Sequence, residues 1–167
     1  MAILPIVTVP NPILKTISEP VEKVDDELRQ FMDDMLETMY DAPGIGLAAV
    51  QVNRAIRVLV IDVSEEESDP EPLYFVNPEI TWTSEELASY KEGCLSVPEQ
   101  YSDIDRPAEC KIKYLDYHGQ AQELHATGLL ATCVQHEMDH LNGVVFIDYL
   151  SSLKRNMMIR KVKKIAR

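Results

Sequence analysis

The stretch His136-Glu137-Met138-Asp139-His140 indicates a metal-binding helix around which the rest of the chain folds, because it places two histidines four residues apart. It lies within residues 129–141, where apolar side chains recur mainly at three- and four-residue steps until Asn142-Gly143, a good helix stop. Residues four apart in a helix share one face, one turn above each other. Both imidazoles can therefore reach a single metal ion, with Glu137 beside them to handle a proton.

A metal held by two imidazoles needs a third protein ligand from elsewhere in the chain. No histidine or glutamate follows His140, so Asp148 is the best downstream candidate. Cys94 is the alternative, because residues 92–96 (EGCLS) form a loop-like segment in which Gly93 permits close backbone approach. Spacing alone favours Cys94 over Asp148 and leaves both open.

The other two cysteines are expected to be apolar packing residues. Cys133 shares the helical face of His136, but a rise of about 10.5 Å separates it from His140, too far for both to meet on one ion. We expect Cys133 to line a pocket beside the metal and Cys110 to lie in the core. Three sparse cysteines also predict a reducing compartment and no structural disulfide.

The remaining sequence predicts an α+β fold. Apolar residues at helical spacing indicate a first amphipathic helix from about residue 25 to 40, ended by the Pro-Gly pair at 43–44. A final helix is expected from about Ser151 to Ala166. Short segments rich in β-branched and aromatic residues predict strands at 56–63, 73–76, 80–83, 110–117 and 122–127. The last two are expected to form a hairpin with its turn around 118–120.

These elements predict a single compact domain, with short antiparallel strands around a central metal-binding HExxH helix and a helix toward each end. The length of 167 residues suits one domain, and the absence of repeats and linkers makes residues 1–167 one catalytic unit. No stretch approaches the roughly 18 apolar residues of a membrane span, and the amino terminus lacks a basic leader.

Charge is distributed unevenly along the chain. The net charge is −12, yet residues 154–167 carry seven of the 16 lysines and arginines and no acid. The acidic body should repel nucleic acid, whereas the basic carboxy-terminal helix is able to attract it. A solvated basic helix face is the alternative interpretation.

Three segments together resemble the signature motifs of peptide deformylases in content, order and spacing: GIGLAAVQ at 44–51, EGCLS at 92–96 and QHEMDH at 135–140. The paired prolines near the start, the long first helix and the basic last helix are also similar to bacterial-type members, so the resemblance covers nearly the whole chain. It implies that Cys94, His136 and His140 hold the metal, with water or hydroxide in the fourth position.

The resemblance implies an activity, namely removal of the formyl group from the N-terminal formyl-methionine of newly made proteins, with release of formate. Glu137 would act as general acid and base. The side-chain amide of Gln51 and the backbone NH of Leu95 would stabilise the developing oxyanion. The peptide would bind as an added strand beside Ile45 and Gly46.

The resemblance also implies a methionine pocket whose apolar, soft side chains suit a thioether, formed by Ile45, Leu129, Cys133 and His136 and completed by Tyr90 and Thr132. Tyr101 stands where some similar enzymes carry a basic residue able to touch the peptide. Contacts beyond the first residue of the substrate are therefore not defined by the resemblance.

Two imidazoles and one thiolate are able to hold iron, zinc, nickel or cobalt, and affinity order does not choose among them. The resemblance implies Fe(II), with Zn(II) often found, and a thiolate on iron predicts sensitivity to oxidation. The implied partners are formyl-methionyl nascent peptides and, through the basic helix, the ribosome. No membrane and no direct DNA binding is expected, and the expected location is the cytoplasm or a bacterial-derived organelle.

Competing interpretations remain at this stage. A metallopeptidase would use the same helix with Asp148 as third ligand, and an inactive relative would only dock on ribosomes. Residues 44–49 match a dinucleotide fingerprint, with Asp62 downstream, but they follow a helix rather than a strand, which argues against nucleotide binding.

The remaining polar residues have simpler explanations. His118 at a turn and His125 in a strand are expected to be solvated or hydrogen-bonded side chains. Arg106 and Asp139 are expected either to pair behind the metal helix or to be plain surface charges.

Overall fold

The computed structural model describes residues 2–165. Within them the helices are α1 (Asp26–Asp41), α2 (Gly128–Leu141) and α3 (Ser152–Ile165), with short 3-10 helices η1 (Pro12–Lys15), η2 (Ala49–Val52) and η3 (Phe146–Tyr149). The strands are β1 (Gly46–Ala48), β2 (Val58–Ile61), β3 (Leu73–Thr83), β4 (Leu87–Cys94), β5 (Val97–Pro107), β6 (Glu109–Leu115) and β7 (Ala121–Thr127).

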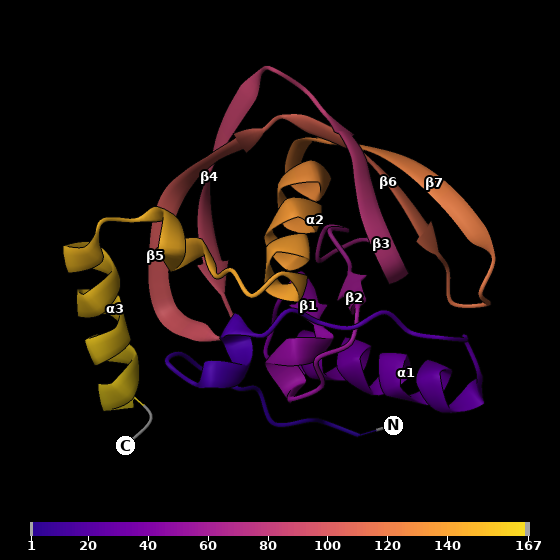
Figure 1. Ribbon diagram of the computed structural model, residues 1–167, viewed down its shortest axis with the longest axis horizontal. Helices are drawn as coiled ribbons and strands as arrows, with labels where there is room; N and C mark the ends of the chain where they lie inside the picture. Colours follow the sequence, from indigo (N-terminus) through magenta and orange to yellow (C-terminus); the bar gives the residue numbers. More distant parts are fainter. Residues whose placement is uncertain (1, 166–167) are drawn as a thin grey trace.

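Helix α2 occupies the centre of the molecule, between two sheets (Figure 1). A five-stranded sheet in the order β1-β2-β3-β6-β7 lies on one side, and the two-stranded ribbon of β4 and β5 lies on the other. All named strand pairs are antiparallel. The predicted α+β fold around a central HExxH helix is confirmed.

Helix α2 is buried on two faces, one against the five-stranded sheet and the other toward the β4–β5 ribbon. One side packs into the core of the five-stranded sheet through Ala131, Val134 and Leu141, while the histidines face the ribbon side. The helix ends where Gly143 adopts a left-handed backbone with φ 77°. A side chain at Gly143 would come within 2.5 Å of the Lys15 carbonyl oxygen, so only glycine fits this helix stop.

Helix α1 forms where the sequence predicts it. The Asp25 side chain caps it by accepting a hydrogen bond from the Leu28 NH at 2.9 Å, and acids in the first turn favour the positive end of the helix dipole. Its buried face, which includes Met32, Met35 and Met39, packs against β1 and β2. This second core cluster fixes the strand that begins at Gly46.

The strand predictions need three corrections, the first of which is β1 (Gly46–Ala48), a short strand that the sequence analysis did not predict. Residues 73–76 and 80–83 belong to one strand, β3, which stays continuous through irregular register shifts around Pro78. The long hairpin β4–β5 is absent from the sequence prediction, and the expected loop at 92–96 is instead the end of β4 and a tight turn. Many of its residues are Glu, Asp, Lys and Ser, which are poor strand formers, so local composition hides a ribbon that packing on α2 stabilises.

The predicted hairpin of β6 and β7 is confirmed, and its turn is organised by the Asp116 carboxylate, which accepts hydrogen bonds from the His118 and Gln120 NH groups. Helix α3 packs on β5 with Val162 buried. Its predicted end at Ala166 lies outside the described residues. Within residues 2–165, no helix is both long and apolar enough to cross a bilayer.

Candidate metal centre and active site

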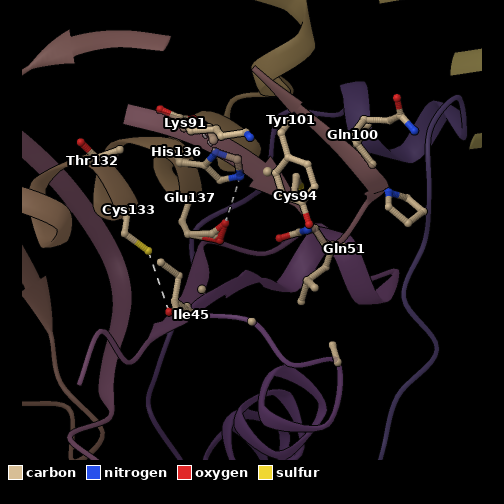
Figure 2. Close-up of a pocket in the computed structure, with 18 of the residues that line it drawn as sticks. Ile45, Gln51, Lys91, Cys94, Gln100, Tyr101, Thr132, Cys133, His136 and Glu137 are labelled. Atoms are coloured by element: carbon tan, nitrogen blue, oxygen red, sulfur yellow. Dashed lines mark hydrogen bonds and ion pairs between the residues drawn. The ribbon is translucent and has the colours of Figure 1, made fainter. Parts of the chain in front are cut away.

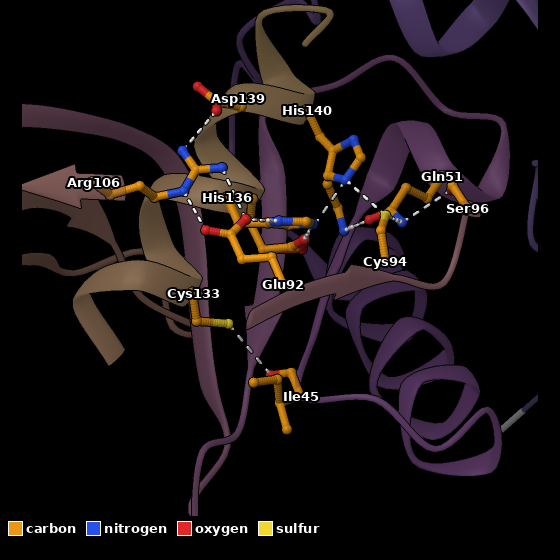
Figure 3. Close-up of polar contacts among 12 residues, drawn as sticks. Ile45, Gln51, Glu92, Cys94, Ser96, Arg106, Cys133, His136, Asp139 and His140 are labelled. Carbon is orange, nitrogen blue, oxygen red and sulfur yellow. Dashed lines mark hydrogen bonds and ion pairs between the residues drawn. The ribbon is translucent and has the colours of Figure 1, made fainter. Parts of the chain in front are cut away.

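The predicted ligand triad is assembled in the structure. Cys94 at the end of β4 and His136 and His140 on α2 bring one ligand atom each to within 4.8 Å of one another. The Cys94 Sγ lies 3.3 Å from the His140 Nε2, and Figure 3 shows the thiol and both imidazoles converging. Two nitrogen donors and one thiolate around a common point suit a tetrahedral metal with one open position.

The alternative prediction, that Asp148 is the third metal ligand, is wrong. Its carboxylate caps η3 by accepting a hydrogen bond from the Val145 NH at 2.9 Å, and it forms ion pairs with Lys15 and Arg155. After the left-handed turn at Gly143, Phe146 stacks on the His136 ring with centroids 6.1 Å apart, while the Asp148 carboxylate is occupied by the η3 cap and by two cations. The metal-ligand cluster that the described residues form contains Cys94 instead.

A glutamate that the sequence prediction missed orients one of the ligands. Glu92, two residues before Cys94 on the inner face of β4, is hydrogen-bonded to the His136 Nδ1 at 2.9 Å. This contact fixes the imidazole so that its Nε2 faces the Cys94 thiol and the other histidine. The available signal was its place in the EGCLS motif, but a buried glutamate is not predictable until the strand is known.

Arg106 holds Glu92 in place and connects it to the metal helix (Figure 3). Its guanidinium contacts the two Glu92 oxygens at 2.7 and 3.0 Å and the Asp139 carboxylate at 2.8 Å. Burial opposes the charge of Glu92, but the hydrogen bonds from His136 and Arg106 lower its pKa overall. Of the two expectations for Arg106 and Asp139, pairing behind the metal helix is therefore confirmed.

Glu137 is the buried carboxyl group nearest to the ligand atoms. Its Oε1 lies 3.7 Å from the His136 Nε2 and 3.9 Å from the His140 Nε2. Burial is the largest effect on this group and raises the pKa of Glu137 to about 7. A carboxyl group that titrates near neutrality is able both to accept and to release a proton in a hydrolytic cycle.

Gln51 presents its amide to the same centre. Its Oε1 accepts a hydrogen bond from the Ala48 NH at 2.9 Å, which turns the amide nitrogen toward the Cys94 Sγ at 3.4 Å and the Ser96 Oγ at 3.0 Å. Leu95 follows Cys94 in the turn between β4 and β5 and lines the cavity. The two residues predicted to stabilise an oxyanion thus lie beside the metal ligands.

A cavity of about 670 Å³ opens beside the triad (Figure 2), a size typical of small-molecule and peptide sites. It is lined by every predicted pocket residue: Ile45, Gly46, Tyr90, Leu129, Thr132, Cys133 and His136. Cys133 is buried and its thiol lies 3.9 Å from the Ile45 carbonyl oxygen, so its expected place on the pocket wall is confirmed, as is that of Cys110 in the core.

Gly46 lies in close contact with the helix α2 side of this cavity. A side chain at Gly46 would come within 2.9 Å of the Cys133 Sγ and 3.1 Å of the Glu137 side chain, so a larger residue would displace the carboxyl group. The absence of a side chain here leaves the backbone of β1 open to the cavity.

Two unpaired strand edges border the cavity. Among the described residues, β1 is an edge strand of its sheet and β4 pairs only with β5. Residues of both strands line the cavity, so their free backbone groups are able to pair with an extended chain. His118 and His125 lie far from this site in the β6–β7 hairpin, where His125 pairs with Glu109 at 2.8 Å.

The site combines an HExxH helix, a cysteine as third ligand and a glutamate whose pKa lies near 7. These features define the protein as a metal-dependent hydrolase. Residues 3–156 match the family model described as polypeptide deformylase. The chain belongs to this family.

Relatives agree over the full length of the chain. The peptide deformylase of Phenylobacterium zucineum is 60% identical over 167 residues, covering 100% of this chain and 99% of the relative. The enzyme of Pelagibacter ubique is 58% identical, covering 99% and 96%. The crystal structure of peptide deformylase from Ehrlichia chaffeensis superposes with a TM-score of 0.96 at 48% identity, covering 99% and 98%. A second Ehrlichia structure, in complex with actinonin, also gives 0.96 at 49% identity, covering 100% and 99%.

Proposed function

We propose that this chain removes the N-formyl group from the N-terminal formyl-methionine of newly synthesised proteins and releases formate. The observation that carries the proposal is the Cys94, His136 and His140 triad, which opens with Glu137 onto a peptide-sized cavity between two free strand edges. The whole chain, residues 1–167, serves as one catalytic unit.

The chemistry divides among a few side chains. A divalent cation in the triad would supply Lewis acidity to water and to the formyl oxygen. Glu137 accepts the proton of the attacking water and delivers it to the amine nitrogen as the formyl C–N bond breaks. The Gln51 amide and the Leu95 NH donate to the formyl oxygen while it carries negative charge. The products are formate and a free amino terminus.

The substrate would lie in the cavity as an extended strand. Backbone groups at Ile45 and Gly46 would pair with the peptide, and the methionine side chain would contact Tyr90, Leu129 and Cys133. The burial and soft sulfur of Cys133 support this assignment, because burial raises the pKa of its thiol and keeps it uncharged beside a thioether.

The metal we propose is Fe(II), with Zn(II), Ni(II) or Co(II) able to occupy the same ligands. The donor set of two imidazoles and one thiolate supports a transition metal and not magnesium or calcium, which take oxygen ligands. Oxidation of the Cys94 thiolate is expected to release the metal, so brief peroxide treatment should lower bound metal and activity together.

The deciding experiment is an anaerobic assay of formate release from a formyl-methionyl peptide, with metal content measured on the same sample. Cys94→Ala is expected to lose both metal and activity. Asp148→Asn is the matched control, because this acid pairs with Lys15 and Arg155 and should leave metal content unchanged. No formate with any of the four metals would overturn the proposal.

We also propose that α3 guides the enzyme to the ribosome, in the cytoplasm or a bacterial-derived organelle. The helix carries six cations and no acid within its described residues: Lys154, Arg155, Arg160, Lys161, Lys163 and Lys164. Deleting the helix would also remove the buried Val162, so Lys163→Gln with Lys164→Gln is the cleaner variant. It should reduce ribosome co-sedimentation at low salt, whereas Lys111→Gln with Lys113→Gln should not. If both double variants sedimented equally with ribosomes, the proposal that α3 binds the ribosome would be contradicted.

A further inference from the structure

The β4–β5 ribbon presents two chemically different faces at the cavity. Its inner face, which carries Tyr90, Glu92 and Arg106, packs toward α2. Its outer face carries Lys91 and Gly93 of β4 and, directly opposite Gly93, Tyr101 of β5. Lys91 and Tyr101 are exposed, yet both line the cavity at its rim (Figure 2).

Gly93 explains how a residue of β5 reaches the cavity across β4. A side chain at Gly93 would come within 2.5 Å of the Tyr101 ring, so the ring lies over the bare backbone of this glycine. The ring therefore lines the same cavity as Cys94, although Tyr101 belongs to the neighbouring strand.

The Tyr101 ring in turn positions a positive charge. The Lys91 Nζ lies 5.7 Å from the ring centroid, within the range of a cation–π contact. Among the described residues, Lys91 is the single lysine or arginine that lines the cavity. None of the ion pairs within residues 2–165 involves it, so its charge is available to a ligand.

If a substrate strand pairs with the free edge of β4, its side chains would alternate between the inner and outer faces of the ribbon, as those of β4 do. Successive side chains of a strand point to opposite faces. If the formyl-methionine side chain enters the inner pocket beside Tyr90 and Cys133, the next side chain must point to the outer face. One strand step is about 3.3 Å, which brings this second residue from Cys94 toward Lys91.

We propose that Lys91, held by Tyr101, forms the subsite for the second residue of the substrate and makes the enzyme favour an acidic side chain there. The inference rests on the proposed deformylase function and adds a specificity to it. The chemistry recognised is a carboxylate one residue after formyl-methionine.

Two exposed acids near Lys91, Asp103 and Glu99, oppose this preference. Asp103 is the cross-strand partner of Lys91 on the outer face, and it belongs to β5, a second strand spacing of about 4.8 Å away. At physiological salt, screening over about 8 Å weakens such an exposed charge more than that of the adjacent lysine. Glu99 is exposed at the cavity rim, and Glu99→Gln is expected to strengthen the preference.

The test compares formyl-Met-Glu-Ser, formyl-Met-Gln-Ser and formyl-Met-Lys-Ser as substrates of the metal-loaded full chain. The kcat/KM for the Glu peptide is expected to exceed that for the Gln peptide about two- to five-fold, as for other exposed charge pairs, with the Lys peptide lowest. Lys91→Met should bring the Glu to Gln ratio to about one, and Lys91→Glu should invert it. Lys113→Met, an exposed strand lysine outside the cavity, should keep the wild-type ratio.

The outcomes separate the subsite from the activity. Equal cleavage of the Glu and Gln peptides by the wild type, or a ratio that Lys91→Met leaves unchanged, would overturn the subsite alone. Absence of formate from all three peptides would overturn the proposed function and the subsite with it. Tyr101→Phe should keep the ratio and Tyr101→Ala should reduce it, and an unchanged ratio in Tyr101→Ala would overturn the role of the ring.

Discussion

Glu137 shows how one residue acquires its chemistry from its surroundings. The sequence places it beside two histidines, but it is burial, with 1% of the residue exposed, that contributes most to raising its pKa to about 7. An exposed glutamate would stay ionised at neutral pH and would release its proton too readily to protonate a departing amine.

Replacing this carboxyl group tests its role directly. Glu137→Gln keeps the shape of the side chain but cannot exchange a proton, so kcat/KM for formate release should fall about 10²- to 10⁴-fold. Metal content, measured on the same sample, should match the wild type because Glu137 is not one of the three ligands. Glu109→Gln, on the hairpin remote from the cavity, serves as the control. Full activity of Glu137→Gln would exclude Glu137 as the proton carrier.

At the scale of elements, one guanidinium ties the ribbon to the metal helix. Arg106 on β5 contacts Glu92 on β4 and Asp139 on α2, and Glu92 in turn orients His136. The alignment of Cys94 with the two histidines therefore depends on contacts between the β4–β5 hairpin and α2, a helix that begins 21 residues after the hairpin ends. None of these contacts is local.

We expect Arg106→Met to weaken metal binding about 10- to 100-fold, because Glu92 would lose the partner that holds it against His136. Competition with a chelator, followed by the spectrum of the Co(II)-loaded chain, measures this loss separately from activity. Arg29→Met is the matched control, since Arg29 pairs with a fully exposed acid at the surface. If Arg106→Met unfolds the chain, Arg106→Lys, which keeps the charge but not the forked contact, should still show weaker binding. Wild-type affinity in the folded variant would contradict the coupling.

At the scale of the whole molecule, the metal site bridges two layers. Its ligands come from the ribbon and from the central helix, so a bound ion joins the two. A ligand that binds only the folded state stabilises it by mass action, about 2.7 kcal/mol at a free concentration 100 times Kd. The ion is thus expected to act on the fold as well as on the reaction.

Metal removal should therefore lower the thermal unfolding midpoint. Anaerobic treatment with a chelator is expected to lower Tm by several degrees, and returning Ni(II) should restore it. Cys94→Ser should begin with the lower Tm and respond little to the chelator. An unchanged Tm after verified metal loss would show that the bound ion does not contribute to the stability of the fold.

Much of this molecule was predictable from local pattern. Helices α1 and α2 and the β6–β7 hairpin follow from periodicity, capping and turn residues, which act over a few neighbouring residues. His136, Glu137 and His140 are equally local, because the helix itself sets their spacing. Cys94 was favoured by spacing and made firm only by the resemblance of three motifs to a family.

The tertiary structure alone decided what depends on contacts between distant segments. It chose Cys94 over Asp148, formed the β4–β5 ribbon from residues with weak strand preference, and buried Glu92 against Arg106. The physical reason is range: helix and turn preferences act within a few residues, whereas burial, charge pairing and ligand convergence depend on how whole elements pack. The sequence determined by itself which helix carries the two histidine ligands, and packing decided that the Cys94 thiol rather than the Asp148 carboxylate completes the set.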